Sequence, residues 1–579
     1  MDSAKHSFRI FTILLAGVFS LAGSTSAQTV AQKKEFLKKI LDASSKIPAH
    51  HKRLLSTGAQ NLLHIAERVN TKFTKPGIGD DGGLTNVWPQ ATALLRPHLK
   101  FLESAAGKVG TIQVSNPALD FLTSVIEGFT QSETSSAWCG NSVVAGYNDS
   151  GAFLRTARVN FLAAWSFNGV SVSANGGKSF KDLALLNPGA DPLNFLSGDP
   201  VVTCSSPSQF YYSSIFSTGT PPDPKGNRNP LSAVSVSPSS NGGLTWGSPI
   251  AAIAKDGFTH QLDKPWMAID PTNAQRLFVT YTDFDFSFPT TGTCAKDSRI
   301  AIELVRSVDG GNTWSAPIVI DEECGASFNG VQGSNVAVSA SGKVFVAFEY
   351  YPGATPNNEI HLKRSLDNGK TFGKTVVVNS EVVPNGAAGT LQGAFRNNEF
   401  PQLAVDRSTT SSRGDIYVAW SDGRNNIVPD LGSPTGIYAY PDILVAKSTD
   451  NGQSFSSAHA VSPTPSDFKG SGRDQFFPGV AVDKDGHVGV CYYDRRNDPN
   501  NTVTDRYCSV SHNQGASWTE QRISSANWLP VHASDILINP AYIGDYDTIT
   551  TDYLLTNSGF FATFEIQTEG NPDVTAGKF

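Results

Sequence analysis

The sequence predicts an all-β domain that is built from one repeated unit and preceded by a small helical region. An eight-residue pattern, Ser-x-Asp/Asn-x-Gly-x-Ser/Thr-Trp/Phe, occurs six times, where on the order of 0.01 matches would be expected by chance. The six copies begin at Ser173, Ser239, Ser307, Ser365, Ser448 and Ser511. Strand-like segments surround each copy, and only 17% of the residues are charged. A turn that recurs at such intervals indicates one supersecondary unit repeated radially or linearly.

The chemistry of the repeated pattern is that of a tight turn. Its Asp or Asn can accept hydrogen bonds from backbone amides two residues further on. Its Gly provides a backbone conformation that a side chain would forbid. We expect the final Trp or Phe to be buried and to hold the turn against its own unit. The pattern is therefore interpreted as structural.

These turns resemble the Asp-box, the bacterial neuraminidase (BNR) repeat of sialidase-like β-propellers, and the resemblance extends over residues 110–579. It implies a β-propeller with the Asp-box between the third and fourth strands of each blade. The resemblance is informative about the fold and much less so about activity, because Asp-boxes also occur in propellers that are not sialidases.

Six Asp-boxes imply six blades, and the C-terminal segment predicts a seventh. Residues 542–566 contain another first-strand pattern and a further strand, but no Asp-box. We expect residues 110–116 to supply the outer strand of this last blade, which would close the ring and protect its edges. We favour seven blades, with six as the alternative.

The N-terminal part differs from the repeats. A basic start, an apolar run over residues 10–23 and a small-residue site ending at Ala27 predict a signal peptide over residues 1–27. The mature protein would then be secreted or periplasmic. Residues 28–109 show apolar side chains at helical spacing. We interpret them as a pro-segment, a cap on the propeller or a module that docks a partner.

Cysteine usage and charge restrict the chemistry. The six cysteines all lie in the repeat region, and an even number in an exported protein suggests disulfides. Fifteen connectivities are possible, and proximity in the sequence favours Cys139–Cys204, Cys294–Cys324 and Cys491–Cys508. No Cys-x-x-Cys spacing occurs, so we expect no zinc site. The net charge of −7 argues against nucleic acid as a partner. We expect a monomer without a transmembrane segment.

If the chain folds as a propeller, polar residues from several blades lie together at one end of the central channel. The innermost strands line the channel, and the residues where they begin share one face with the ends of the second strands. The starts of the first strands contribute Glu133, Asp199, Asp263, Lys264, Gln332, Glu399, Asp474, Gln475, Asp545 and Tyr546. The ends of the second strands contribute Asp149, Asp283, Glu349, Asp422, Arg424, Asp494, Arg495 and Arg496. This face is therefore expected to be rich in carboxylates.

The resemblance to sialidases assigns roles to some of these residues. In that family three arginines hold the carboxylate of the sugar, a Tyr–Glu pair supplies the nucleophile and an Asp acts as acid and base. By position Tyr546 would be the tyrosine, with Glu399 as its partner and Asp263 as one option for the acid. The arginines that would bind the substrate are Arg424, Arg473 and Arg495.

The sequence also departs from the sialidase pattern. The family's Phe/Tyr-Arg-Ile-Pro motif has only one counterpart, Phe8-Arg9-Ile10-Phe11, inside the predicted signal peptide. Three interpretations stay open: a glycoside hydrolase of the exo-α-sialidase type, a non-catalytic propeller that binds a glycan or glycoprotein, and a channel whose polar residues are structural. We expect no cofactor, although a structural cation in the channel is compatible with the carboxylates. No Gly-x-Ser-x-Gly motif indicates serine hydrolase chemistry.

Overall fold

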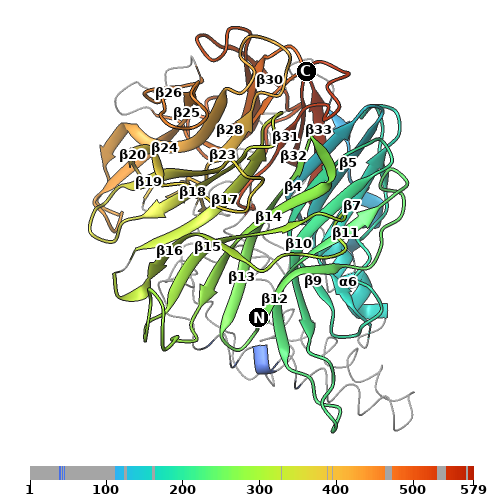
Figure 1. The fold of residues 1–579 in the computed structure, drawn as a ribbon. Coiled ribbons are helices and arrows are strands. Elements are labelled where there is room, and N and C mark those ends of the chain that lie inside the picture. Colours follow the sequence, from blue (N-terminus) through green and yellow to red (C-terminus); the bar gives the residue numbers. More distant parts are fainter. Residues whose placement is uncertain are drawn as a thin grey trace, which may run out of the picture.

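Seven antiparallel sheets surround a central axis in the computed structural model, which confirms the seven-bladed β-propeller (Figure 1). The model describes residues 35, 38–40, 42, 45, 111–122, 127–128, 130–159, 163–327, 329–387, 389–393, 395–462, 472–530, 543–568 and 571–579. The predicted signal peptide and nearly all of the predicted helical region lie outside these residues. Among the described residues, no helix is long and apolar enough to cross a membrane.

In blades 1 to 6 the four main strands follow chain order from the axis outward. Blades 1 to 3 consist of β4 (Gln131–Cys139), β5 (Ser142–Asp149), β7 (Asn168–Ser173) and β8 (Lys181–Asp182); β9 (Phe195–Cys204), β10 (Phe210–Gly219), β11 (Pro230–Ser239) and β12 (Ile250–Asp256); and β13 (His260–Asp270), β14 (Asn273–Asp285), β15 (Arg299–Ser307) and β16 (Ile318–Cys324). Blades 4 to 6 consist of β17 (Gly330–Val338), β18 (Val344–Tyr351), β19 (Asn358–Ser365) and β20 (Val376–Val382); β23 (Gln402–Val405), β24 (Ile416–Pro429), β25 (Ile437–Ser448) and β26 (His459–Ala460); and β27 (Gln475–Val482), β28 (Val488–Asp494), β29 (Asp505–Ser511) and β30 (Thr519–Arg522).

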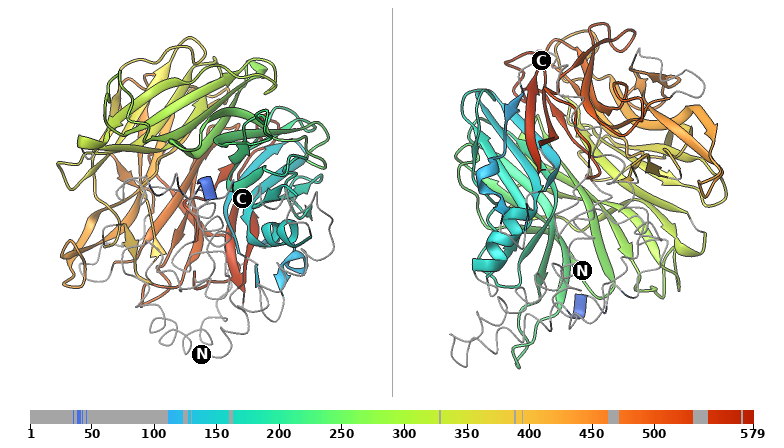
Figure 2. Two further views of the ribbon diagram at one scale, coloured as in Figure 1. Left: turned by 90° about the horizontal axis from the view of Figure 1, so that it is seen from below. Right: turned by 180° about the vertical axis from the view of Figure 1, so that it is seen from behind.

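The seventh blade joins the two ends of the propeller. Its strands are β31 (Ile549–Thr550), β32 (Phe561–Thr568), β33 (Asn571–Lys578) and, outermost, β1 (Ile112–Gln113). Ile112 pairs with Ala576 and Gln113 with Thr575, which confirms the expected closure by residues 110–116. The C-terminal strands lie beside the first blade in both views of Figure 2. The ring therefore closes between two segments that are far apart in the sequence.

Short elements lie between and beside the blades. They are η3 (Pro117–Leu119), β2 (Phe121–Leu122), β3 (Glu127–Gly128), α6 (Ser150–Val159), β6 (Trp165–Ser166), η4 (Gly325–Ser327), β21 (Thr390–Leu391) and β22 (Phe395–Arg396). From the N-terminal region, Lys39 Nζ donates to the backbone oxygen of Arg228 (3.2 Å) and to Oδ1 of Asn229 (3.1 Å), in the connection between β10 and β11. This contact lies at the end of the ring where the innermost strands begin, which we call the channel mouth.

The repeated turn joins the third and fourth strands of blades 1 to 6, and its hydrogen bonds are the same in all six copies. In the first copy, Ser173 Oγ donates to Asn175 Oδ1 (2.8 Å), Gly177 N donates to Ser173 Oγ (3.0 Å) and Ser179 N donates to Asn175 Oδ1 (3.1 Å). The other five copies repeat these three bonds. The turns lie at the end of the blades opposite the channel mouth.

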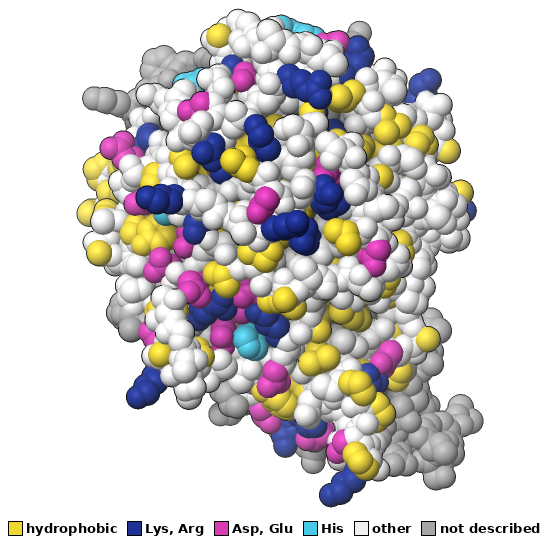
Figure 3. All heavy atoms as spheres, viewed as in Figure 1, with side chains coloured by type: hydrophobic (Ala, Val, Ile, Leu, Met, Phe, Trp, Pro, Cys, Tyr) yellow, Lys and Arg dark blue, Asp and Glu magenta, His cyan; other side chains and the backbone are white. Residues whose placement is uncertain are grey.

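The sequence suggested that the final aromatic residue of the turn packs within its own blade. In the structure it also packs against a neighbouring blade. Phe180 lies 5.8 Å from Phe561 of blade 7, between ring centroids. Among the described residues, the hydrophobic core forms seven clusters, one at each seam between blades, and the turn's aromatic residue packs against six of them. The turn therefore fastens one blade to the preceding one. On the face in view in Figure 3, Lys and Arg side chains are interspersed with those of Asp and Glu.

The three disulfides join Cys139 to Cys204, Cys294 to Cys324 and Cys491 to Cys508, which are the pairs expected from the sequence. The first links the innermost strands of blades 1 and 2. The third joins residues directly opposite each other on β28 and β29. One disulfide thus crosses a seam, and the other two lie within single blades.

Candidate functional site

A left-handed backbone recurs at the same place in most innermost strands, near the channel mouth. The residues are Glu133 (φ 53°), Asp199 (φ 55°), Lys264 (φ 50°), Gly333 (φ 67°) and Phe477 (φ 49°). Strand pairing shifts register at each of these places, as in a β-bulge. A left-handed conformation costs a non-glycine residue roughly 1–2 kcal/mol. Such strain gathers at functional sites, and three of these five residues, Glu133, Asp199 and Lys264, are charged.

Lys264 lies at the centre of the polar residues of the mouth. Its side chain is buried, and Nζ lies 3.3 Å from the centroid of the Tyr546 ring. The rings of Phe400 and Trp266 are 5.5 and 5.9 Å from Nζ. Among the described residues, Nζ has no hydrogen-bond partner. Burial lowers the pKa of this ammonium, and the surrounding carboxylates oppose the shift.

Four buried carboxylates from four blades surround this ammonium. They belong to Glu133, Asp199, Asp263 and Asp545. Burial, followed by repulsion from Glu133, raises the pKa of Asp199 well above its usual value. The backbone N of Asp545 donates to Glu133 Oε1 (3.0 Å), and Gln332 Nε2 donates to Asp263 Oδ2 (3.2 Å). Four buried carboxyl groups from different blades thus lie close to one cation.

Glu399 belongs to a second carboxyl pair at the mouth. It shares a hydrogen bond with Glu349, and Asn385 N donates to Glu399 Oε1 (2.8 Å). Tyr351 Oη and Asn358 Nδ2 donate to the two oxygens of Glu349 (2.9 and 2.8 Å). Burial raises the pKa of Glu349 to about 7 and that of Glu399 well above its usual value. Both carboxyl groups therefore favour the protonated form more than an exposed glutamic acid does.

The sequence suggested Glu399 as the partner of Tyr546, and the contacts of the described residues include no hydrogen bond between the two. The Tyr546 hydroxyl donates to the backbone oxygen of Pro200 (2.8 Å). Burial, followed by Glu133 and Asp199, raises the pKa of this phenol well above its usual value. The pairing was inferred from position in the repeat alone, which does not specify the direction of a side chain. Asp263 and Tyr546, in contrast, are brought together around Lys264.

Each of the three predicted arginines has its own partners. Arg424 pairs with Asp422 (2.6 Å), and its Nη2 also donates to Asn379 Oδ1. Arg495 is wholly buried and pairs with Asp474 (2.9 Å). Arg473 is partly exposed, and its Nη1 donates to the backbone oxygen of the preceding Gly472. An incoming carboxylate would have to compete with these partners.

A further arginine, which the sequence reasoning missed, reaches the cluster around Lys264. Arg396 Nη2 donates to both carboxylate oxygens of Asp545 (2.8 Å each), and Asn398 Nδ2 donates to Asp545 Oδ1 (3.1 Å). Both residues lie on the connection between β20 and β23, as does Asn385. The length of this connection was the signal in the sequence that could have pointed to Arg396 and Asn398, because long connections in compact domains are commonly functional.

The channel below the mouth contains two cavities. The upper one has a volume of about 150 Å³ and is lined in part by Trp266, Asn335 and Gln402. The lower one, of about 220 Å³, reaches Arg407 and Tyr553 near the opposite end. Trp266 also packs edge-on against Tyr546, with ring centroids 5.5 Å apart. Of the residues around Lys264, Trp266 therefore borders the upper cavity, whereas Lys264 and its four carboxylates are buried.

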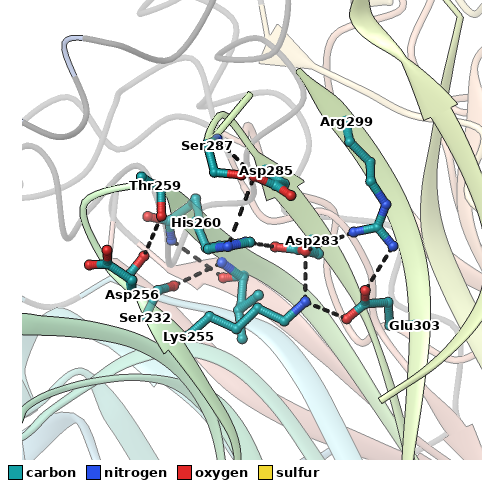
Figure 4. Close-up of polar contacts among 12 residues, drawn as sticks. Ser232, Lys255, Asp256, Thr259, His260, Asp283, Asp285, Ser287, Arg299 and Glu303 are labelled. Carbon is teal, nitrogen blue, oxygen red and sulfur yellow. Dashed lines mark hydrogen bonds and ion pairs between the residues drawn. The ribbon is translucent and has the colours of Figure 1, made fainter. Parts of the chain in front are cut away.

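A separate ionic network spans blades 2 and 3 (Figure 4). Asp283 accepts from Lys255 Nζ (2.8 Å), from Arg299 Nη1 (3.2 Å) and interacts with His260 Nδ1 (3.0 Å). Lys255 and Arg299 also bind Glu303. Lys255 and Arg299 neutralise the charge of the carboxylates in this network, so we regard the network as structural.

No protein-family model and no curated protein matches this sequence. Solved structures that resemble it include an α-L-arabinanase from Penicillium chrysogenum complexed with arabinobiose, with 11% identity, a TM-score of 0.43, and 81% of this chain and 97% of that chain covered. A Hadza microbial sialidase shows 13% identity and a TM-score of 0.38, with 66% of this chain and 65% of that chain covered. A Dyadobacter fermentans protein of unknown function shows 12% identity and a TM-score of 0.41, with 82% and 98% covered. Because these TM-scores are below 0.5, the activities remain those of the compared proteins.

Proposed function

We propose that this chain is an exported, sialidase-like Asp-box propeller that acts on glycans at the channel mouth. The observation that carries the proposal is the convergence of Asp263, Lys264 and Tyr546 with the carboxylates of neighbouring blades. Export is supported by the basic and apolar character of residues 1–27 and by the three disulfides. Carboxyl groups suit sugar hydroxyls and the acid–base chemistry of glycosidic bonds.

In the catalytic form of the proposal, Asp263 serves as the acid and Tyr546 as the nucleophile. Tyr546 would have to leave the backbone oxygen of Pro200 and find a base. Glu133 and Asp199 are better placed for this than Glu399, because they dominate the charge effects on the Tyr546 phenol. Substrate binding is proposed for Arg424, Arg473 and Arg495, and Arg396 is added because it reaches Asp545.

A non-catalytic glycan-binding propeller is the second candidate. It is favoured by the hydrogen bond from the Tyr546 hydroxyl to a backbone oxygen, which leaves no proton transfer prepared between the phenol and a carboxylate. In this form the mouth binds a glycan or glycoprotein and does not cleave it.

The test is a screen of the mature protein against fluorogenic glycosides, with sialosides first, followed by Tyr546→Phe in any assay that shows turnover. We expect Tyr546→Phe to lower kcat by at least a hundredfold with little change in Tm. The matched control is Tyr553→Phe, because the Tyr553 hydroxyl also donates to a backbone oxygen, that of Ile269, but near the other end of the channel. Binding without turnover would select the second candidate. The absence of both binding and turnover would refute the proposal.

A further inference from the structure

A cluster of imidazole and carboxylate groups lies at the end of blade 6 that is opposite the channel mouth. Asp483, Asp485 and His487 belong to the tight turn between β27 and β28. One potential ligand atom from each residue lies within 4.8 Å of those of the other two. From this geometry we propose that blade 6 carries a binding site for a divalent transition metal ion of the zinc type.

A second imidazole comes from another element. His512 follows β29 and packs edge-on against His487, with ring centroids 4.2 Å apart and an interplanar angle of 76°. His512 and Asp485 are exposed and His487 is partly exposed, so an ion can reach the group from solvent. The group offers one imidazole and two carboxylates, and His512 lies beside it as a second imidazole. Nitrogen and carboxylate donors together suit Zn²⁺, Cu²⁺ or Ni²⁺, whereas Ca²⁺ and Mg²⁺ prefer oxygen ligands alone.

The backbone already holds the group in place. Asp483 Oδ1 accepts from the backbone N of Asp485 (2.9 Å) and of His487 (3.0 Å). Asp485 Oδ2 accepts from Ser558 Oγ (2.6 Å), and Asp483 Oδ2 accepts from Gly559 N (3.1 Å), both in blade 7. In a tetrahedral Zn²⁺ site with bonds of about 2.0–2.2 Å, ligand atoms lie about 3.3–3.6 Å apart. Closing the group around an ion therefore needs its ligand atoms to approach one another by up to roughly 1.3 Å.

The site occupies a place that other blades use for a different contact. In blade 4 the corresponding turn residue is Lys343, whose Nζ donates to Asn451 Oδ1 in the repeated turn of blade 5 (2.6 Å). Blade 7 has no repeated turn, and blade 6 has His487 instead of a lysine. A metal held by Asp483, Asp485, His487 and His512 would stiffen the turns of blade 6 that lie against blade 7.

The network around His260 provides an internal comparison. His260, Asp283 and Asp285 also approach within 4.8 Å, but Lys255 and Arg299 already bind Asp283 (Figure 4). An ion there would have to displace two partly buried cations. At the blade 6 site Lys484 pairs with Asp485 at the surface (2.8 Å), and His487 Nδ1 lies 3.3 Å from Asp483 Oδ2. Exposed pairs such as that of Lys484 with Asp485 are weak, so an incoming ion can displace the lysine.

The test is calorimetric titration of Zn²⁺ into the full chain after chelator treatment, with Tm measured in parallel. We expect one saturable site and a rise in Tm, with at least tenfold weaker binding in His487→Gln and in His512→Gln. His260→Gln is the matched control and should bind Zn²⁺ as the parent does.

Three outcomes would overturn the proposal. One is the absence of saturable binding. Another is binding that persists unchanged in both the His487 and the His512 variants, which would place the ion elsewhere. The third is binding that is lost in His260→Gln.

Discussion

The paired carboxyl groups of Glu349 and Glu399 make the stability of the protein depend on pH. The pKa of Glu349 is raised from 4.5 to about 7, and that of Glu399 is raised well above its usual value. Between about pH 4.5 and pH 7 the folded protein therefore holds protons that the unfolded chain has released. Stability is present at low pH and falls as pH rises through this window, by on the order of 3 kcal/mol for a group such as Glu349.

The substitution Glu399→Gln should reduce the loss of stability that occurs as pH rises. The amide oxygen can accept from Asn385 N and the amide nitrogen can donate to Glu349, so the Glu349 carboxylate gains a donor and no longer needs a proton. We expect the fall in the free energy of unfolding between pH 5 and pH 8, measured with urea, to be smaller than in the parent. Glu381→Gln is the control, because that side chain is 78% exposed. Equal pH dependence of the parent and Glu399→Gln would contradict this account.

For single residues, the sequence predicted which of them lie at the channel mouth, but not which groups they contact. Asp263, Lys264 and Tyr546 follow from the position of the innermost strands. The bond from Tyr546 to Pro200 and the approach of Arg396 to Asp545 depend on side-chain directions and on a long connection. No local pattern encodes contacts between residues so far apart in the chain.

At the scale of single elements, the repeated turn allows a sharp test within one copy. Gly176 and Gly177 both have left-handed backbones (φ 70° and 82°). A Cβ on Gly176 would meet nothing within 4 Å, whereas one on Gly177 would lie 2.5 Å from the Phe561 ring. Asn368 occupies the equivalent position in the copy that begins at Ser365 and has a similar φ of 62°. A side chain is therefore tolerated at this position of the turn.

We expect Gly176→Ala to lower the free energy of unfolding by about 1 kcal/mol, the cost of the left-handed conformation. Gly177→Ala should cost at least 1 kcal/mol more, because it also overpacks the seam with blade 7. Chemical denaturation of the two variants measures the difference. Equal costs would show that the turn does not pack against blade 7 as described.

The closing strand β1 offers a second test at this scale. Deletion up to residue 109 keeps β1, whereas deletion up to residue 116 removes it together with the buried Val114. The longer deletion leaves β33 as an open edge that can pair between molecules. We expect the shorter product to stay monomeric in light scattering and the longer one to aggregate. Similar solubility and Tm for both would refute closure by β1.

For the whole molecule, the fold was more predictable than the site. Seven blades, closure by residues 110–116 and all three disulfides follow from signals that recur along the chain, such as the turns, the strand patterns and the cysteine spacing. Packing of the turn's aromatic residues across seams was not predicted, because it depends on contacts between blades. The predicted helical region over residues 28–109 remains a prediction, since it lies almost entirely outside the described residues.

The central claim is that glycans bind at the channel mouth, and hydrogen exchange with bound sialyllactose tests it most directly. We predict slower exchange in peptides that contain the backbone amides of Asn385 and Asp545, which donate to Glu399 and Glu133 at the mouth. Exchange in the repeated turns at the opposite end should not change. Protection confined to those turns, or no protection anywhere at saturating sialyllactose, would contradict the claim.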